Sequence, residues 1–365
     1  MLRQRFSRIF NRYLTYTEQY TQAPYLTWQT RVVNRQSTFF SNNYSILKRT
    51  AVGITKLIHI NMAGNASSVP PLVTTAWLSD ALRDQQLSSS SSSSCSVRIL
   101  DATWLGIVTE GPDAFRVEHI PGSVHFDLNQ CRDESSRLYF TLPSAEDFAK
   151  YVGELGIDNE THVVVYENDP IFRMMSAPRT WWMFRTFGHD KISILDGGLK
   201  QWKEDGFAVE GGNQTVDQRT FMAKPPNLHL IKYFDEVLEN QKTEKFSLID
   251  CRLPEWFDGS MDSIWPDMPL GYILKTVNVP FGRLVRSDSD RMVAREDILQ
   301  IFQSAGIDLS RPLVCSCFVG ISACTVALAA YVVGKEDVAI YDGSWDEFYK
   351  RAPKDSHVIV PDPPK

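Results

Sequence analysis

The sequence lacks the features that define several protein classes. Its 365 residues contain no uninterrupted apolar stretch near the roughly 18 residues that a transmembrane helix needs. The longest apolar run, 323–333, is better interpreted as a buried helix inside a domain. No secretory signal is visible, and no Cys-x-x-Cys pair has a matching second pair or a histidine cluster. The six cysteines therefore predict reduced thiols, without disulfides and without a zinc or other metal site.

Basic residues are scarce outside the N-terminus. The chain has 38 basic and 44 acidic residues. Nine of the basic residues and one acidic residue lie within residues 1–62, so the rest of the chain has 29 basic and 43 acidic residues. A body this acidic argues against nucleic acid as a partner, because phosphate binding needs clustered cations. Together with the missing apolar span, the charge distribution predicts a protein that binds neither nucleic acid nor membrane.

The basic leader, residues 1–62, has a pattern of its own. Arg5, Arg8 and Arg12 recur at helical spacing, and so do the apolar residues Phe6, Ile9, Phe10 and Tyr13. An amphipathic, Arg-rich and acid-poor N-terminus is typical of a mitochondrial transit peptide, so we expect a mitochondrial protein. A disordered basic tail is the alternative interpretation.

Beyond the leader, the chain repeats one order of motifs. Each half contains a short strand ending in Asp, an extended turn segment, an apolar strand, a helix and an Asp-Gly segment. In the first half these segments are 99–101, 119–126, 162–166, 181–187 and 194–202, and in the second half 248–250, 272–281, 312–316, 323–333 and 340–345. Short apolar strands that alternate with helices predict an α/β fold with a parallel sheet covered by helices on both faces. Two tandem copies of one such domain follow from the repeat.

The repeat also sets the expected boundaries. We predict a first domain at 70–210, a linker at 211–226 and a second domain at 227–352, after the leader 1–62. The linker contains Gly, Asn and Gln residues and no apolar periodicity.

A cysteine-containing loop in the second half is the candidate functional site. An apolar strand ends at Cys317, and the loop Phe318, Val319, Gly320, Ile321, Ser322 leads into a helix. Ligands of open α/β sheets bind at the carboxyl ends of strands, and backbone N–H groups with a helix N-terminus favour a thiolate there. Gly320 permits a backbone conformation that other residues resist, and Ser322 is a candidate N-cap. The alternative is a buried cysteine at a strand end, which is also how we interpret Cys315 and Cys324.

These features together resemble the two-domain rhodanese family of thiosulfate and 3-mercaptopyruvate sulfurtransferases. The resemblance covers roughly Thr74–Ala352, and its motifs are 119–122, 176–179 with 181–184, 195–198 and 341–345. The mercaptopyruvate branch is the closer resemblance, on Gln130-Cys131 and on 181–185. The first domain has no cysteine in its equivalent loop, 167–175, and is interpreted as a non-catalytic partner. His119 is expected to shape a turn rather than to take part in chemistry.

The resemblance implies a mechanism. The cysteine that matches Cys317 attacks a small sulfur donor, carries the sulfur as a persulfide, and passes it to cyanide, a thiol or a thioredoxin-like acceptor. This is covalent nucleophilic catalysis in two half-reactions, supported by backbone amides and without a metal or organic cofactor.

The chain departs from the family pattern at the site itself. The mercaptopyruvate enzymes carry Cys-Gly-Ser-Gly-Val-Thr in this loop, and the thiosulfate enzymes Cys-Arg-Lys-Gly-Val-Thr, whereas this chain reads Cys-Phe-Val-Gly-Ile-Ser. Val319 replaces the serine of the proposed Ser-His-Asp relay, and Phe140 and Asn129 align with its histidine and aspartate. We therefore expect the relay to be absent.

The residues that bind substrate carboxylate also differ. Arg252 is retained as a candidate substrate-binding residue, although an ion pair with Glu255 or Asp258 is an alternative role for it. Trp256 is the second candidate substrate-binding residue, and it stands where the first substrate arginine of the family is expected. The position of the second substrate arginine falls near Trp265. Since an Arg–carboxylate hydrogen bond contributes about 1.5–3 kcal/mol, we expect weak turnover of both thiosulfate and 3-mercaptopyruvate.

Two functions remain open from the sequence. The first is a sulfurtransferase that acts through a Cys317 persulfide, and the second is a catalytically weak or inactive rhodanese-fold binding protein. A cysteine phosphatase would need Cys-x5-Arg to grip phosphate, but Ala323 occupies the arginine position.

Overall fold

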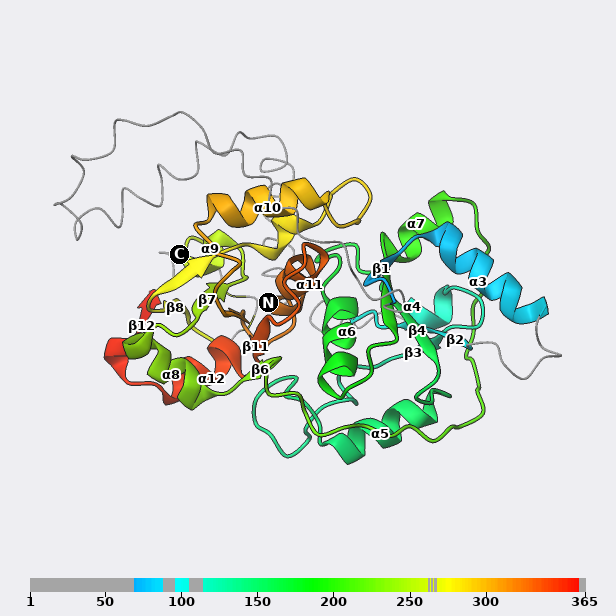
Figure 1. Cartoon of the computed structure of the whole chain (residues 1–365), viewed down its shortest axis with the longest axis horizontal. Coiled ribbons are helices and arrows are strands. Elements are labelled where there is room, and N and C mark those ends of the chain that lie inside the picture. Colours follow the sequence, from blue (N-terminus) through cyan, green and yellow to red (C-terminus); the bar gives the residue numbers. More distant parts are fainter. Residues whose placement is uncertain are drawn as a thin grey trace, which may run out of the picture.

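The computed structural model describes residues 69–87, 96–104, 114–261, 263, 265 and 268–360. The predicted leader, the serine run 88–94 and Cys95 lie outside these residues. Figure 1 shows two lobes joined through the middle of the molecule, with the described residues up to about 210 in one lobe and those from about 230 onward in the other.

The first lobe alternates strands and helices. Its elements are β1 (Leu72–Val73), α3 (Thr75–Leu87), β2 (Val97–Asp101), α4 (Ala114–Val117), β3 (Val124–His125), α5 (Ala145–Glu154), β4 (His162–Tyr166), α6 (Ser176–Thr186), β5 (Ile192–Leu195) and α7 (Gly198–Glu204). The five strands form a parallel sheet in the order β1-β5-β4-β2-β3.

The second lobe repeats this plan. Its elements are β6 (Ile231–Lys232), α8 (Phe234–Thr243), β7 (Ser247–Asp250), α9 (Pro254–Phe257), β8 (Leu270–Ile273), β9 (Thr276–Asn278), the 3-10 helix η1 (Phe281–Leu284), α10 (Arg295–Ser304), β10 (Leu313–Ser316), α11 (Ala323–Val332), β11 (Ala339–Tyr341), α12 (Ser344–Arg351), η2 (Lys354–Ser356) and β12 (His357–Val360). The parallel sheet order is β6-β11-β10-β7-β9, and β12 pairs antiparallel with β8 beside it. The predicted pair of α/β domains is confirmed, because the two strand orders correspond position by position. Residues 211–226, between the lobes, contain no helix or strand.

Helices bury apolar side chains on both faces of the first sheet. Leu78 of α3 and Leu199 and Trp202 of α7 pack against one face, while Phe148 of α5 and Trp181 of α6 pack against the other. Strand β4 reads His-Val-Val-Val-Tyr and is buried throughout, as expected for a central parallel strand. In the second lobe α8 and α12 meet through Phe234 and Phe348, and α10 contacts α11.

One hydrophobic core runs from the second face of the first sheet into the second lobe. Helices α6 and α11 are in contact, and Trp181 and Arg185 of α6 pack on the Tyr331 ring of α11. The Thr325 hydroxyl of α11 donates to the Met174 carbonyl oxygen at 2.7 Å. The lobes are therefore joined by packed side chains directly behind the cysteine loop.

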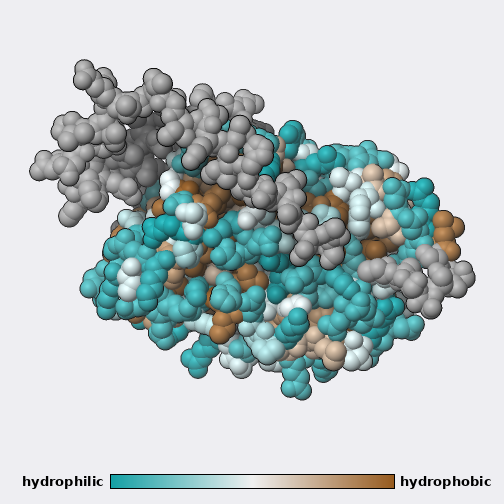
Figure 2. Space-filling model, viewed as in Figure 1, coloured by the Kyte–Doolittle hydropathy of each residue, from teal (hydrophilic) through white to brown (hydrophobic). Residues whose placement is uncertain are grey.

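The outer surface is mainly polar. Figure 2 shows hydrophilic residues over most of the visible face, with hydrophobic residues in small patches. No helix within the described ranges is both long and apolar enough to cross a membrane.

His119 is buried, stacks on Phe115 with ring centroids 4.0 Å apart, and hydrogen-bonds the Phe115 carbonyl oxygen through Nδ1 at 2.7 Å.

Candidate functional site

The cysteine loop joins the carboxyl end of β10 to α11. Strand β10 ends at Ser316, Cys317 follows immediately, and α11 begins at Ala323. The Gly320 N–H donates to the Cys317 Sγ at 3.1 Å. Gly320 has φ +80°, in the left-handed region that favours glycine, so the predicted need for glycine here is confirmed.

The first residues of α12 hold the loop in place through hydrogen bonds. The Cys317 N–H donates to the Ser344 hydroxyl at 3.1 Å, and that hydroxyl donates to the Tyr341 carbonyl oxygen at 2.8 Å. The Trp345 N–H donates to the Cys317 carbonyl oxygen at 3.1 Å. Because both main-chain groups of Cys317 are paired, the position of its side chain is set by the fold.

Two expectations about this loop are corrected. Ser322 occupies the N-cap position of α11, but it has helical backbone angles (φ −66°, ψ −17°) and its side chain makes no capping hydrogen bond. An effective cap needs extended angles to bring its oxygen over the first N–H groups. Several backbone N–H groups were expected to favour the thiolate, but within the described residues Gly320 supplies the one N–H that donates to the sulfur.

Cys317 faces a small aromatic cavity. Cys317 is 2% exposed and lines a cavity of about 30 Å³. Six aromatic residues line this cavity: Trp104, Phe172, Trp256, Trp265, Phe281 and Phe318. Met175, Val319, Ile321 and Ser322 complete its lining. The space suffices for about one water-sized group, such as a single added sulfur atom.

The structure brings Trp256 to this cavity but turns Arg252 away from it. Trp256 packs edge-on against Phe318, with ring centroids 5.3 Å apart. Arg252 is fully buried and forms an ion pair with Asp250 at 2.5 Å. The alternative expected from the sequence, an ion pair with Glu255 or Asp258, is wrong about the partner. It lies behind Phe318, with its guanidinium carbon 4.8 Å from that ring centroid. The role predicted for Arg252 in binding substrate stays a prediction, and its contacts are those of a structural residue.

The positions aligned with the family relay carry no proton-transfer group. Val319 and Phe140 are buried, and the Asn129 side chain accepts a hydrogen bond from the Trp104 indole at 3.3 Å. Phe140 packs edge-on against Trp104, at 5.0 Å between ring centroids. Aromatic packing therefore occupies this part of the cleft.

Arg179 is a residue of the site that the sequence reasoning did not single out. It belongs to α6 of the first domain, is 1% exposed, and forms an ion pair with Asp342 of the second domain at 2.7 Å. It also donates to the carbonyl oxygens of Gly320, at 3.2 Å, and of Phe140. Burial alone would lower the pKa of Arg179, but Asp342 and Cys324 together offset this and raise it. The first domain thus holds the loop that carries Cys317 in place. In the sequence, Arg179 was indicated only as part of the Ser-Ala-Pro-Arg motif at 176–179.

The first domain fills its equivalent loop with a carboxylate. Glu167 is the counterpart of Cys317 in the first domain. It directly follows Tyr166, which pairs with Asp101 of the adjacent strand. Cys317 likewise directly follows Ser316, which pairs with Asp250. The Glu167 side chain accepts from the N–H groups of Met175 and Ala177, at 2.7–3.0 Å, and from the Ser176 hydroxyl at 3.0 Å. Burial, with the nearby Asp169, raises the pKa of Glu167 to about 7. The non-catalytic role of the first domain stays a prediction.

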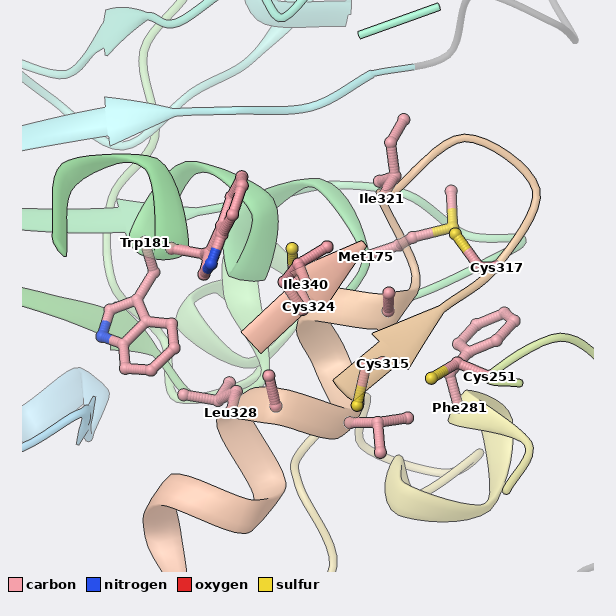
Figure 3. Close-up of a cluster of buried hydrophobic side chains, with 14 of the residues drawn as sticks. Met175, Trp181, Cys251, Phe281, Cys315, Cys317, Ile321, Cys324, Leu328 and Ile340 are labelled. Carbon is pink, nitrogen blue, oxygen red and sulfur yellow. The ribbon is translucent and has the colours of Figure 1, made fainter. Parts of the chain in front are cut away.

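The other cysteines of the second domain lie in the core. Figure 3 shows Cys251, Cys315 and Cys324 among apolar side chains around β10 and α11. All three are fully buried, and burial raises the pKa of Cys251 and of Cys324 well above the usual value for a thiol. Within the described part of the chain, no cluster of three His, Cys, Asp or Glu residues is arranged to hold a metal ion.

Comparison with known proteins identifies the family. The rhodanese-like domain model matches residues 76–205 and 233–351. The chain is 40% identical over 291 residues to thiosulfate sulfurtransferase of Mus musculus, which covers 79% of this chain and 94% of that protein. It is 39% identical over 284 residues to 3-mercaptopyruvate sulfurtransferase of Homo sapiens, covering 77% and 92%. These two identities are too close to separate the branches.

A solved structure has the same fold. The crystal structure of SseA from Escherichia coli, described as a 3-mercaptopyruvate sulfotransferase, superposes with a TM-score of 0.65 at 30% sequence identity. The match covers 76% of this chain and 99% of that one. The paired sheets, the cysteine loop and these matches establish that the chain belongs to the rhodanese family of sulfurtransferases.

Proposed function

We propose that the protein moves sulfane sulfur from a small donor to a thiol or cyanide acceptor through a persulfide on Cys317. The observation that carries this proposal is the Cys317 Sγ at the carboxyl end of β10, facing a cavity and accepting a hydrogen bond from the Gly320 N–H at 3.1 Å. A hydrogen bond to an anionic acceptor is stronger than one to a neutral acceptor, so it stabilises a nucleophilic sulfur.

The reaction divides into two half-reactions. The Cys317 sulfur attacks the outer sulfur of the donor, the donor leaves with the electron pair of the broken bond, and a Cys317 persulfide remains. The acceptor then attacks the outer sulfur of that persulfide and releases the Cys317 thiolate. A thiosulfate- or 3-mercaptopyruvate-like compound is the donor class of the family, and a thioredoxin-like protein is a further acceptor.

The second candidate function is a rhodanese-fold protein that binds a ligand with little or no turnover. The cavity favours it, because Val319, Phe140 and Asn129 replace the relay and no cation among the described residues lines the cavity. A protein of this kind would retain the fold and lose sulfur transfer.

Intact-mass spectrometry separates the two functions. Purified protein is incubated with thiosulfate, 3-mercaptopyruvate or an organic hydropersulfide, and an increase of about 32 Da, the mass of one sulfur atom, is sought. The adduct is expected on the wild type and on Cys131→Ser, which replaces a buried cysteine of the first domain, and not on Cys317→Ser. No adduct from any donor would favour the binding protein.

We further propose that residues 1–62 direct the protein to mitochondria. The support is the excess of nine basic residues over one acid and the helical spacing of Arg5, Arg8 and Arg12. A fluorescent protein fused to residues 1–62 is expected in mitochondria, whereas replacing the three arginines with glutamine should leave it in the cytosol. Identical distributions would contradict the proposal.

A further inference from the structure

The cavity in front of Cys317 is unusual in its chemistry. Its lining consists of aromatic and aliphatic side chains together with Ser322 and the cysteine itself. An anion that enters such a site loses its hydration and gains no opposite charge, which is costly. The lining therefore selects against charged donors.

The cations near the loop are already committed. Arg252 is fully buried, paired with Asp250 and separated from the cavity by the Phe318 ring. Arg179 is paired with Asp342 behind the loop. Neither guanidinium lines the cavity, and no other Lys or Arg of the described ranges does so.

The stretches of sequence that adjoin Trp104 and Trp265 contain no Lys or Arg. Residues 105–113, which follow Trp104, contain no Lys or Arg but include Glu110 and Asp113. Residues 262, 264, 266 and 267, around Trp265, are Asp, Ile, Pro and Asp. These stretches of sequence are therefore acidic rather than basic.

Aromatic side chains continue from the cavity to the surface. Trp104 of the first domain lies 6.4 Å from Trp265 of the second domain, ring centroid to centroid, in a stacked arrangement. Trp265 in turn lies 4.7 Å from Tyr139, which is 50% exposed. The three rings form a continuous apolar face, here called the aromatic ladder, that leads from solvent to Cys317 between the domains.

We propose that the sulfur donor is an uncharged organic hydropersulfide, R–S–SH, whose apolar or aromatic group R lies on the aromatic ladder. This inference rests on the proposed function. The Cys317 thiolate attacks the outer sulfur, the S–S bond of the donor breaks, R–S⁻ leaves with the bonding electrons, and the proton stays on the new persulfide, Cys317–S–SH. Atoms and charge balance without an oxidant or a metal.

The cavity suits this step in size and polarity. Its volume of about 30 Å³ admits the transferred sulfur but not the whole donor, so R must remain on the ladder. An apolar site favours the neutral form of a donor over its anion, and the neutral hydropersulfide is the electrophilic form. The one anion that the step needs before attack, the Cys317 thiolate, is supported by the hydrogen bond from the Gly320 N–H.

The test compares donors that share one reactive group. Benzyl hydropersulfide, glutathione hydropersulfide and thiosulfate are each mixed with the full-length protein, and the rate of the 32 Da addition to Cys317 is followed by intact mass. Rates are divided by those of each donor with a small-molecule thiol. Burial of one aromatic group on the ladder predicts a benzyl rate about tenfold or more above that of the charged glutathione donor. Thiosulfate is expected to be the slowest.

Variants locate the effect. Trp265→Ala should slow benzyl hydropersulfide about tenfold and leave the glutathione donor nearly unchanged, and Trp265→Phe should retain most of the benzyl rate. Trp77→Ala is the matched control, since Trp77 is a partly buried tryptophan that packs on His162 of the first domain, away from the loop. Val319→Lys should raise the thiosulfate rate and lower the benzyl rate.

The outcomes distinguish the two levels of inference. Thiosulfate or glutathione hydropersulfide loading Cys317 as fast as the benzyl donor, or Trp265→Ala slowing all donors equally, would overturn the apolar donor and leave sulfur transfer standing. Absence of the adduct with every donor would overturn the sulfur-transfer proposal itself.

Discussion

Replacing Arg179 with methionine should destabilise the protein and slow the loading of Cys317. Arg179 is 1% exposed, is paired with Asp342 at 2.7 Å, and donates to the carbonyl oxygens of Gly320 and Phe140. Methionine fills most of the volume but leaves the buried Asp342 carboxylate without its counter-charge. Removing one partner of a buried ion pair costs about 3–5 kcal/mol. That is a large fraction of the roughly 5–15 kcal/mol by which a protein is stable.

Urea unfolding, followed by circular dichroism and tryptophan fluorescence, measures the loss. Arg179→Met, Asp342→Asn and the double variant form a cycle. Because the two side chains touch, the double variant should be more stable than the sum of the single losses implies, by about 1–3 kcal/mol. Persulfide formation should also slow in the folded variant, since the Gly320 main chain, held by Arg179, positions the N–H that donates to the Cys317 sulfur.

A second arginine provides the control. Arg219 pairs with Asp158 at 2.9 Å, but both side chains are over 30% exposed, so Arg219→Met should cost about 0–1 kcal/mol. An Arg179→Met loss no greater than that of Arg219→Met, with additive effects in the cycle, would refute the view that this ion pair fastens the loop to the first domain.

Two further predictions concern the two loops. The pKa of Glu167 is raised from 4.5 to about 7, so the folded state keeps a proton that the unfolded chain loses, and stability should fall by about 3 kcal/mol as pH rises from 4.5 to 7. Glu167→Gln should flatten this part of a plot of urea midpoint against pH, and equal slopes in both proteins would contradict the assignment. Gly320→Ala should cost about 1–3 kcal/mol and slow persulfide formation, because φ is +80° and the added Cβ would lie 2.7 Å from the Asp342 carbonyl oxygen. Gly306→Ala is the control, because Gly306 has φ +74° with open space around it, so this variant should show only the backbone strain of a positive φ. Equal rates of persulfide formation on Cys317 in the two variants would argue against a special role for Gly320.

Much of the architecture was predictable because it is local. The repeated order of strands and helices predicted two parallel sheets, and the strand that ends beside Cys317 runs Leu313–Ser316. The left-handed glycine at 320 was also expected from the strand-loop-helix pattern. Apolar periodicity and turn chemistry are properties of short segments, so they can be read without knowing what the segments touch.

Details that depend on side-chain direction were not predictable in this way. The Ser322 cap failed because the residue already has helical angles, which cannot be read from its identity. Arg252 pairs with Asp250, the last residue of the strand that leads into it, and not with either of the two acids that follow it. A sequence pattern supplies the candidates for a pair, and packing selects among them.

The amino-acid sequence by itself determined the two-domain α/β plan, the cysteine loop in the second domain, and the absence of Lys and Arg from that loop. The tertiary structure alone decided that Arg179 and Asp342, from different domains, hold the loop between them, and that Trp104 and Trp265 meet in front of it. The physical reason is that strands and helices arise from contacts between near neighbours in the chain. A cleft between domains arises from pairs of residues more than a hundred positions apart, and no periodicity connects them.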